Sequence, residues 1–198
     1  MIWAIVLAAG ESKRMGQPKM LLPFRSKTIL ETVIDTLLET SMGGIIVVLG
    51  AESATLSARL ESYPVKIVRN PGYRSGMLSS VQAGFSALPK GVTAALLALG
   101  DQPAVSSGVI RQLLALHRRL PESILIPVYQ GRRGHPVLIP SGYHPEISML
   151  SPNIGLRELM RRHPEAIREV AVGEAMILQD IDDPETYRQA IDDDQGQD

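Results

Sequence analysis

Short apolar runs alternate with segments of helical periodicity along almost the whole chain. The runs are continuous rather than alternating, which is typical of strands covered on both faces of a sheet. They predict strands at Ile2–Ala8, Ile45–Leu49, Val65–Val68, Ala94–Leu99, Ile124–Val128, Pro136–Ile139 and Ile167–Val172. Between the runs, apolar residues recur at helical spacing. The predicted helices cover Ile29–Leu38, Glu52–Leu60, Ser79–Leu88, Ser107–Leu120, Ile154–Arg162 and Pro184–Ile191.

Strands that alternate with helices indicate an α/β domain with a mainly parallel sheet. One connection differs, because the turn Gly131–Gly134 joins two strands directly and predicts that part of the sheet is antiparallel. No linker rich in Gly, Pro or Ser divides the chain, so a single domain is expected over residues 1–191. Residues 192–198 are acidic and polar and are expected to form a disordered tail.

The composition is that of a globular protein with balanced charge. Among 198 residues, 20 Lys and Arg stand against 21 Asp and Glu, for a formal charge of -1. This balance argues against nucleic-acid binding, which needs surplus cations. No apolar stretch approaches the roughly 20 residues that span a bilayer, so no membrane association is expected. The absence of Cys excludes disulfides, Cys-based metal sites and a cysteine nucleophile, and it fits a cytoplasmic location.

Ligands bind at the carboxyl ends of the strands in a parallel sheet, and polar residues gather there in this sequence. The first strand runs into a loop that contains Gly10, Gly16 and the cations Lys13, Arg14 and Lys19. Glycines let main-chain N–H groups approach a polyphosphate, and the cations can neutralise it. Because neither a P-loop nor a dinucleotide fingerprint is present, an ordinary loop with solvated cations is the alternative interpretation.

Two later strands also end in polar loops. Asp101 follows the strand 94–99 and can hold a hard cation such as Mg²⁺ through oxygen, although Gly, Asp and Pro also form ordinary turns. The loop Asn70–Ser80 leads into a helix whose N-terminus can offer N–H donors to a base or a phosphate. Alternatively, Ser79 or Ser80 caps that helix.

Several segments occur in a characteristic order: LAAGESKRMGQPK, NPGYRSGMLSSVQAG, GDQP, RRGHPVLI and DIDDPETY. Together they closely resemble the molybdenum cofactor cytidylyltransferase family, within the wider MobA-like nucleotidyltransferase superfamily. The resemblance covers roughly residues 2–190. It implies a three-layer α/β/α, Rossmann-like nucleotidyltransferase fold with a mostly parallel mixed sheet.

The resemblance also implies an activity. The chain would be a Mg²⁺-dependent enzyme that transfers CMP from CTP to the terminal phosphate of molybdopterin and releases pyrophosphate. Two anions must meet in line in such a reaction, so the site has to supply positive charge and positioning. A molybdenum hydroxylase that receives the labile product would be a handover partner.

Residue roles on the nucleotide side follow from the same resemblance. The residues that would bind the nucleotide are Leu7, Ala8, Ala9, Gly10, Arg14, Lys19 and Ser80. Arg14 and Lys19 would clamp the phosphates and, with Asp101, would be the catalytic residues. The backbone of the LAAG segment would contact the nucleotide, and Ser80 would lie beside the base.

The metal and the acceptor would use other residues. Asp101 and Asp182 would hold Mg²⁺, with Asp180 as the alternative to Asp182, because strand alternation would place both on one face. Arg133 and His135 would lie where the acceptor binds. His135 would position the acceptor rather than exchange protons, since a phosphate monoester is already ionised near neutral pH.

The first loop bears on the choice of base. It reads Leu-Ala-Ala-Gly, as is typical of cytidylyl-transferring members, whereas guanylyl-transferring relatives usually carry Leu-Ala-Gly-Gly. The methyl group of Ala9 would crowd a purine, or it would restrict the conformation of the backbone that contacts the base. CTP is therefore expected over GTP.

Two positions depart from the family pattern. Pro152 and Asn153 stand where members commonly have Gly-Asp, and Asp183 stands where Thr is usual. Without a carboxylate at position 153, the acceptor would differ or the activity would be weaker. Asp183 can serve as the N-cap of the helix that Pro184 begins.

Other activities stay open at this point. One alternative is nucleotidyl transfer with GTP or to another phosphorylated acceptor, such as a sugar or alcohol phosphate. Another is a non-catalytic accessory protein that binds the molybdenum cofactor and hands it on.

Overall fold

The computed structural model describes residues 1–151 and 154–195, and within them eight strands form one sheet. The strands are β1 (Ile2–Ala8), β4 (Ile45–Leu49), β5 (Lys66–Arg69), β6 (Ala94–Leu99), β7 (Ile124–Tyr129), β8 (Arg132–Arg133), β9 (Val137–Pro140) and β10 (Ile167–Ala171). Their order is β10-β7-β9-β6-β1-β4-β5, with β8 paired to β7. The predicted strands are therefore confirmed to within a residue or two at their ends.

The sheet is mixed and mostly parallel, as predicted. β1 lies at its centre and pairs in parallel with both β4 and β6. β9 runs antiparallel to β6 and β7, and β8 runs antiparallel to β7. Between β7 and β8, Gln130 and Gly131 have φ values of 48° and 77°. Positive φ at both central residues is the geometry of a tight hairpin turn, which explains why no helix intervenes.

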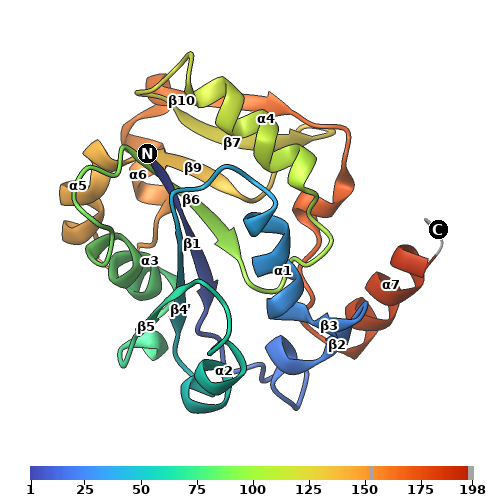
Figure 1. Ribbon diagram of the computed structural model, residues 1–198. Helices are drawn as coiled ribbons and strands as arrows, with labels where there is room; N and C mark the ends of the chain where they lie inside the picture. Colours follow the sequence, from blue (N-terminus) through green and yellow to red (C-terminus); the bar gives the residue numbers. More distant parts are fainter. Residues whose placement is uncertain (152–153, 196–198) are drawn as a thin grey trace.

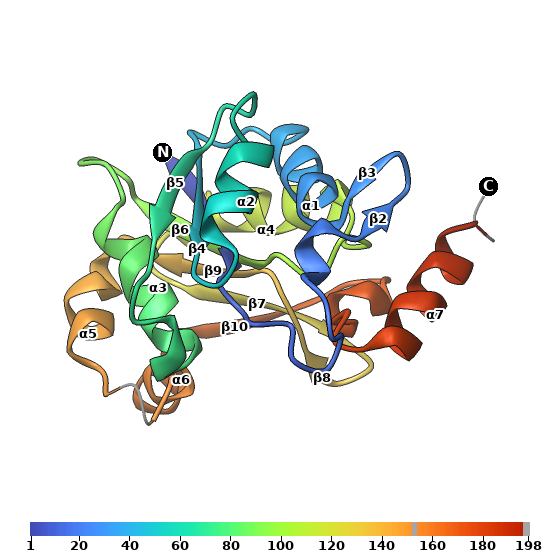
Figure 2. The same cartoon turned by 90° about the horizontal axis from the view of Figure 1, so that it is seen from below.

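Helices cover both faces of the sheet and make three layers. They are α1 (Ile29–Leu38), α2 (Ser53–Arg59), α3 (Met77–Ser86), α4 (Ser107–His117), α5 (His144–Met149), α6 (Arg157–Arg162) and α7 (Pro184–Gln195). Figure 2 shows α1, α2 and α4 on one side of the sheet and α3, α5 and α6 on the other. None of the described helices is long and apolar enough to cross a membrane.

Alternate residues of the central strands enter the two cores. Ala4 and Val6 of β1 pack in the core beneath α1, α2 and α4. Ile5 and Leu7 pack in the core beneath α3, α5 and α6. A strand buried on both faces therefore reads as one continuous apolar run, which is the pattern seen at Ile2–Ala8.

N-cap residues in the sequence mark the start of α1 but not the start of α3. Thr28 caps α1, since its hydroxyl accepts from the Glu31 N–H at 3.3 Å while Glu31 accepts from the Thr28 N–H at 2.9 Å. By contrast, neither Ser79 nor Ser80 caps α3, because the helix begins earlier, at Met77 after Gly76. Gly76 has a φ of 103°, which favours glycine.

Other helix boundaries differ from the prediction. α4 ends at His117 rather than Leu120, and α6 begins at Arg157 rather than Ile154. α5, a short helix with Pro in its first turn, is absent from the predicted helices. Short 3-10 helices lie at Lys19–Leu21, Tyr73–Ser75, Ser141–Tyr143, Pro164–Ala166 and Ala175–Leu178.

The prediction of a disordered tail from Asp192 is wrong for the part that the structure describes. α7 continues to Gln195, and Asp194 pairs with Arg25 at 2.5 Å. Arg25 lies between β2 (Pro23–Phe24) and β3 (Lys27–Thr28), a small hairpin beside α7 (Figure 1). This hairpin gives the acidic end of α7 a cation to pair with. Residues 196–198 lie outside the described residues.

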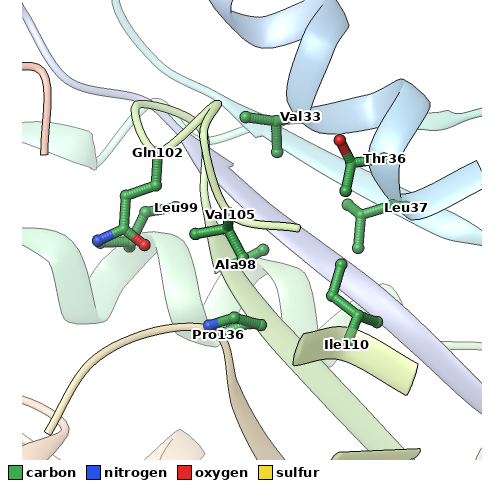
Figure 3. Close-up of a pocket in the computed structure, with 9 residues that line it drawn as sticks. All are labelled: Val33, Thr36, Leu37, Ala98, Leu99, Gln102, Val105, Ile110 and Pro136. Atoms are coloured by element: carbon green, nitrogen blue, oxygen red, sulfur yellow. The ribbon is translucent and has the colours of Figure 1, made fainter. Parts of the chain in front are cut away.

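A small cavity lies between α1, α4 and the end of β6 (Figure 3). Its volume is about 20 Å³, and its walls are almost entirely apolar. Val33 and Leu37 line it from α1, and Val105 lies opposite them. A cavity of this size can accept a water only where polar partners exist, so it represents missing packing.

Adding a methyl group to this cavity should stabilise the protein. Val33→Ile is expected to raise the melting temperature by about 2–4 °C, because cavity filling contributes about 1 kcal/mol in a protein of this size. Differential scanning calorimetry measures the change. Val47→Ile is the matched control, since Val47 is fully buried in β4 away from the cavity and the extra methyl would overpack it. Equal melting temperatures for the two variants would contradict this account.

Candidate active site

A cleft of about 430 Å³ opens at the carboxyl edge of the sheet; we call it the central cleft. Of the residues that the sequence assigned to the nucleotide and the metal, those lining the cleft are Leu7, Ala9, Gly10, Arg14, Lys19, Ser80, Asp101 and Asp182. Ala8 does not line it, because its side chain is buried under α1. Loops that follow β1, β5 and β6 thus meet at one place, as expected for a parallel sheet.

The loop after β1 is held in shape by Ser12. Its backbone carbonyl accepts from the N–H groups of Met15 and Gly16, both at 3.1 Å. Its hydroxyl accepts from the backbone N–H of Lys19 at 3.1 Å. Ser12 has a φ of 52°, so the chain turns sharply there. The turn returns the chain to the cleft and places Lys19 inside it.

Lys19 joins two carboxylates that lie far apart in the sequence. Its ammonium donates to Asp101 Oδ2 at 2.5 Å and to Asp182 Oδ1 at 2.7 Å. The Lys19 side chain is only 8% exposed. Arg14, which is largely exposed, pairs with the other oxygen of Asp182 at 2.5 Å. The two predicted clamp cations and the two predicted metal ligands therefore form one network.

Burial and charge act against each other in this network. Burial raises the pKa of Asp101, and Lys19 only partly opposes the change. Burial alone would also raise the pKa of Asp182, but the neighbouring Lys19 and Arg14 outweigh it and lower that pKa. Burial alone would lower the pKa of Lys19, but Asp101 and Asp182 raise it overall. Lys19 therefore stays positively charged, as a phosphate ligand must.

Asp182 and Asp180 both line the central cleft, but their partners differ. The expectation that strand alternation relates them is wrong, because residues 179–183 form no strand. Asp182 meets the cations, whereas Asp180 accepts from the Gln102 side-chain amide at 2.6 Å. The Ile181 N–H donates to the Asp101 carbonyl at 3.0 Å. These bonds dock the C-terminal segment onto the loop after β6.

Gln102 and Asp183 each have a structural role in this region that the sequence predicts only in part. Gln102, which is 5% exposed, was not singled out by the sequence analysis, although it lies in the GDQP segment. Asp183 caps α7, as the alternative interpretation held, because its carboxylate accepts from the Thr186 N–H at 2.9 Å. Pro152 and Asn153, the other departure from the family pattern, lie outside the described residues.

A second cleft, of about 660 Å³, adjoins the central one; we call it the side cleft. Met77 lines both clefts. Arg133 and His135 line the side cleft together with Arg157 and Arg161 from α6. The rest of its wall is mainly apolar, so the cleft combines cations with a hydrophobic surface.

The cations of the side cleft differ in their partners. Arg133 pairs with Glu169 at 2.8 Å, and Arg161 pairs with Glu158 at 2.8 Å. Among the described residues, Arg157 has no hydrogen-bond or ion-pair partner. Burial lowers the pKa of His135, which favours its neutral form. Arg157 is thus the cation of this cleft most available to an incoming anion.

Close backbone packing explains the glycine beside His135. A Cβ atom at Gly134 would clash with the backbone carbonyl of Ile177. That carbonyl accepts from the His135 N–H at 3.0 Å. The chain before Asp180 therefore packs directly against the wall of the side cleft. The same C-terminal segment contributes Asp182 to the central cleft, so it contacts both clefts.

Cations and carboxylates at the carboxyl edge of a parallel sheet suit the transfer of a phosphate-linked nucleotide, the chemistry of nucleotidyltransferases. Comparison with known families gives the same class. The model of the MobA-like NTP transferase domain matches residues 4–167. The chain therefore belongs to the MobA-like NTP transferase family and is a nucleotidyltransferase.

Individual relatives carry different names. The chain is 34% identical over 190 residues to the nicotine blue oxidoreductase of Paenarthrobacter nicotinovorans, covering 91% of this chain and 92% of that protein. It is 32% identical over 187 residues to the molybdenum cofactor cytidylyltransferase of Escherichia coli K12, covering 92% of each. The crystal structure of Rv0371c from Mycobacterium tuberculosis is similar, with a TM-score of 0.85, 26% identity and coverage of 96% and 97%. That protein has also been crystallised in complex with manganese.

Removing the central cation should destabilise the fold. Lys19→Met is expected to lower the free energy of unfolding at pH 7 by about 3 kcal/mol, because the buried Asp101 carboxylate loses its counter-charge. Urea denaturation followed by circular dichroism measures the loss. The double variant Lys19→Met/Asp101→Asn buries a neutral amide instead and should recover at least half of it. A single variant as stable as the wild type would contradict this role of Lys19.

Proposed function

We propose that this nucleotidyltransferase transfers CMP from CTP to the terminal phosphate of molybdopterin. The observation that carries the proposal is the junction of the two clefts at Met77. One cleft holds the candidate phosphate-binding cations, and the other holds Arg157, which has no partner among the described residues. The similarity to a molybdenum cofactor cytidylyltransferase over 92% of both chains supports this choice of substrates.

The reaction requires one bond to form as another breaks. An oxygen of the acceptor phosphate bonds to the α-phosphorus of CTP, and the bond from that phosphorus to the bridging oxygen of the β-phosphate breaks. The electron pair leaves with pyrophosphate. Lys19 and Arg14 would hold the phosphates in line and offset the repulsion between the two anions. No general base is required, because the acceptor phosphate is already ionised.

The carboxylates fit a divalent cation that binds together with the nucleotide. Asp101 and Asp182 both direct oxygens to one point, where Lys19 Nζ now lies. Among the described residues, no group of three or more carboxylates or imidazoles could hold a metal ion alone. Mg²⁺ commonly uses one or two carboxylates and takes other ligands from substrate phosphates. Once bound, Mg²⁺ would supply charge neutralisation at the α-phosphate.

Lys19 would then exchange partners. A triphosphate in the central cleft offers Lys19 oxygen acceptors that replace one or both carboxylates, and the freed carboxylates become available as metal ligands. The short loop held by Ser12 keeps Lys19 within reach of both arrangements. This exchange leaves no buried carboxylate without a cation.

The side cleft suits a planar phosphorylated acceptor. Its apolar wall, with Leu156 and Met160 from the α6 region, can contact a flat heterocycle such as a pterin. Arg157 and Arg133 can bind an anionic group by forked contacts. Neutral His135 would position the acceptor through hydrogen bonds. A molybdenum hydroxylase would then receive the labile product.

The nucleobase would lie at the opposite end of the central cleft from the cations. Ala9 lines that cleft and is 8% exposed, so its methyl group limits the room for a purine. This supports CTP over GTP. The relative named nicotine blue oxidoreductase is more similar to this chain, at 34% identity against 32%, so a redox reaction must be tested beside nucleotidyl transfer.

The purified protein, given Mg²⁺, molybdopterin and equal CTP and GTP, should form the cytosine dinucleotide and release pyrophosphate. Mass spectrometry of the product reports the base, and a coupled assay reports pyrophosphate. Asp101→Asn should reduce turnover about 100-fold or more. Asp35→Asn, which removes a carboxylate on α1 outside both clefts, should leave turnover unchanged.

Three results would contradict the proposal. A guanine product at least as abundant as the cytosine product would overturn the choice of CTP. Tight pterin binding without pyrophosphate release would indicate a non-catalytic accessory protein. Reduction of nicotine blue by a nicotinamide nucleotide, with no dinucleotide formed, would indicate an oxidoreductase.

A further inference from the structure

Asn70 is a buried polar residue beside the central cleft that the reaction described above does not use. It directly follows β5 and is 7% exposed. Its side-chain amide donates to two hydroxyl oxygens, Ser79 Oγ at 2.9 Å and Ser80 Oγ at 3.0 Å. Its side-chain oxygen accepts from the Gly72 N–H at 2.9 Å. The bonds to the serines join the polar loop after β5 to the first turn of α3.

The Gly72 N–H decides which way the Asn70 amide faces. A backbone N–H can only donate, so it must meet the side-chain oxygen of Asn70. The NH₂ group is therefore turned toward the two serines, and the opposite orientation would set donor against donor. Asn70 thus acts as a hydrogen-bond donor to both hydroxyls.

The two serines then differ in where their own hydrogens can go. Ser79 Oγ lies 2.8 Å from the Gly76 carbonyl and 3.1 Å from the Gly72 carbonyl, so its hydrogen is used locally. Ser80 Oγ accepts from Asn70, and no acceptor for its hydrogen occurs among the described residues. Ser80 is 3% exposed and lines the central cleft. Its hydrogen is left for a ligand.

We propose that Asn70 sets the base specificity of the central cleft by keeping the hydrogen of the Ser80 hydroxyl free to donate to the nucleobase. This inference rests on the proposed function, because it takes the ligand of the cleft to be a nucleoside triphosphate. Asn70 is a positioning residue: it acts through Ser80 and does not touch the substrate itself.

A fixed donor distinguishes the pairing edges of the bases. Cytosine presents two adjacent acceptors, O2 and N3. Guanine presents N–H donors at the matching positions of its pairing edge, N1 and N2. A donated hydrogen is accepted in the first arrangement, whereas the second offers it no acceptor at these positions, and unpaired buried donors discriminate strongly. The Ser80 hydroxyl therefore adds a polar criterion to the steric one set by Ala9.

The location of the pair supports this role. β5 and β6 lie on opposite sides of β1 in the sheet. The loop after β5 contributes Asn70 and the helix α3 that follows it contributes Ser80, whereas the loop after β6 contributes Asp101, which meets the phosphate-binding cations. The donor hydroxyl thus lies on the side of the cleft away from the carboxylates, where the base would extend.

Asn70→Asp tests the proposal with almost no change of shape. One oxygen of the introduced carboxylate still accepts from the Gly72 N–H, but the second oxygen accepts where the amide donated. Ser80 would then donate to this carboxylate and present a lone pair to the cleft. Calorimetric titration with Mg-CTP and Mg-GTP should show CTP binding weakened about 10-fold or more, with the ratio of the two dissociation constants shifted toward GTP.

Variants at the two serines separate specificity from loop structure. Ser80→Ala should reduce CTP preference by itself, and Asn70→Asp added to Ser80→Ala should change the preference no further. Ser79→Ala is the matched control, because the same amide bonds Ser79 but its hydrogen is used locally, and it should keep the wild-type ratio. Thermal melting of every variant reports any loss of fold.

The outcomes are distinguishable from failure of the proposed function. An unchanged ratio in Asn70→Asp, or an equal shift in the presence of Ser80→Ala, would overturn the inference while dinucleotide synthesis stands. Selective CTP binding without any transfer to molybdopterin would overturn the proposed reaction and leave the role of Asn70 supported. Absence of nucleotide binding by the wild type would overturn both.

Discussion

One buried ammonium group holds three distant parts of the chain together. Lys19 comes from the loop after β1, Asp101 from the loop after β6, and Asp182 from the segment before α7. Without that cation, the two carboxylates would repel each other in a region of low polarity. The C-terminal segment adds only a few further bonds to the loop after β6, such as that of Asp180 with Gln102. The shape of the central cleft therefore depends on a charge that is itself suited to bind phosphate.

A buried ion pair is a poor means of stabilising a fold, since apolar residues of similar volume often do as well. Its presence here is better explained by binding. The central strands already fill both cores with apolar side chains, and the charged residues lie only beyond their carboxyl ends. The residues that pack the cores lie within the strands, and the charged residues of the cleft lie in the segments beyond the strand ends. The exchange of ionic partners proposed for Lys19 would therefore leave the cores undisturbed.

The spacing of apolar residues predicts the three layers, because the strands and helices that form both cores are each marked by a local apolar pattern. The bounds of β1, β4, β6 and α1 follow from continuous apolar runs and from the capping box of Thr28 and Glu31. The start of α3 does not, since Gly76, rather than a serine cap, begins it. The pairing of Asp182, and not Asp180, with Lys19 depends on how the C-terminal segment docks, which is a long-range contact. Asn70 was noted only as the start of a loop, because a buried amide is recognised by its partners and not by its spacing.

The residues proposed to set base specificity and those proposed to bind the phosphates lie on different sides of β1. The loop after β5 supplies Asn70 and the start of α3 supplies Ser80, while the loop after β6 and the C-terminal segment supply the carboxylates around Lys19. Substitutions on the first side can alter which base fits and leave the ionic network intact. One fold can therefore serve several substrates, as the differing names of its relatives illustrate. The identity of the substrate has to be argued from hydrogen-bond donors and acceptors in the cleft, since the phosphate-binding half would look the same in each case.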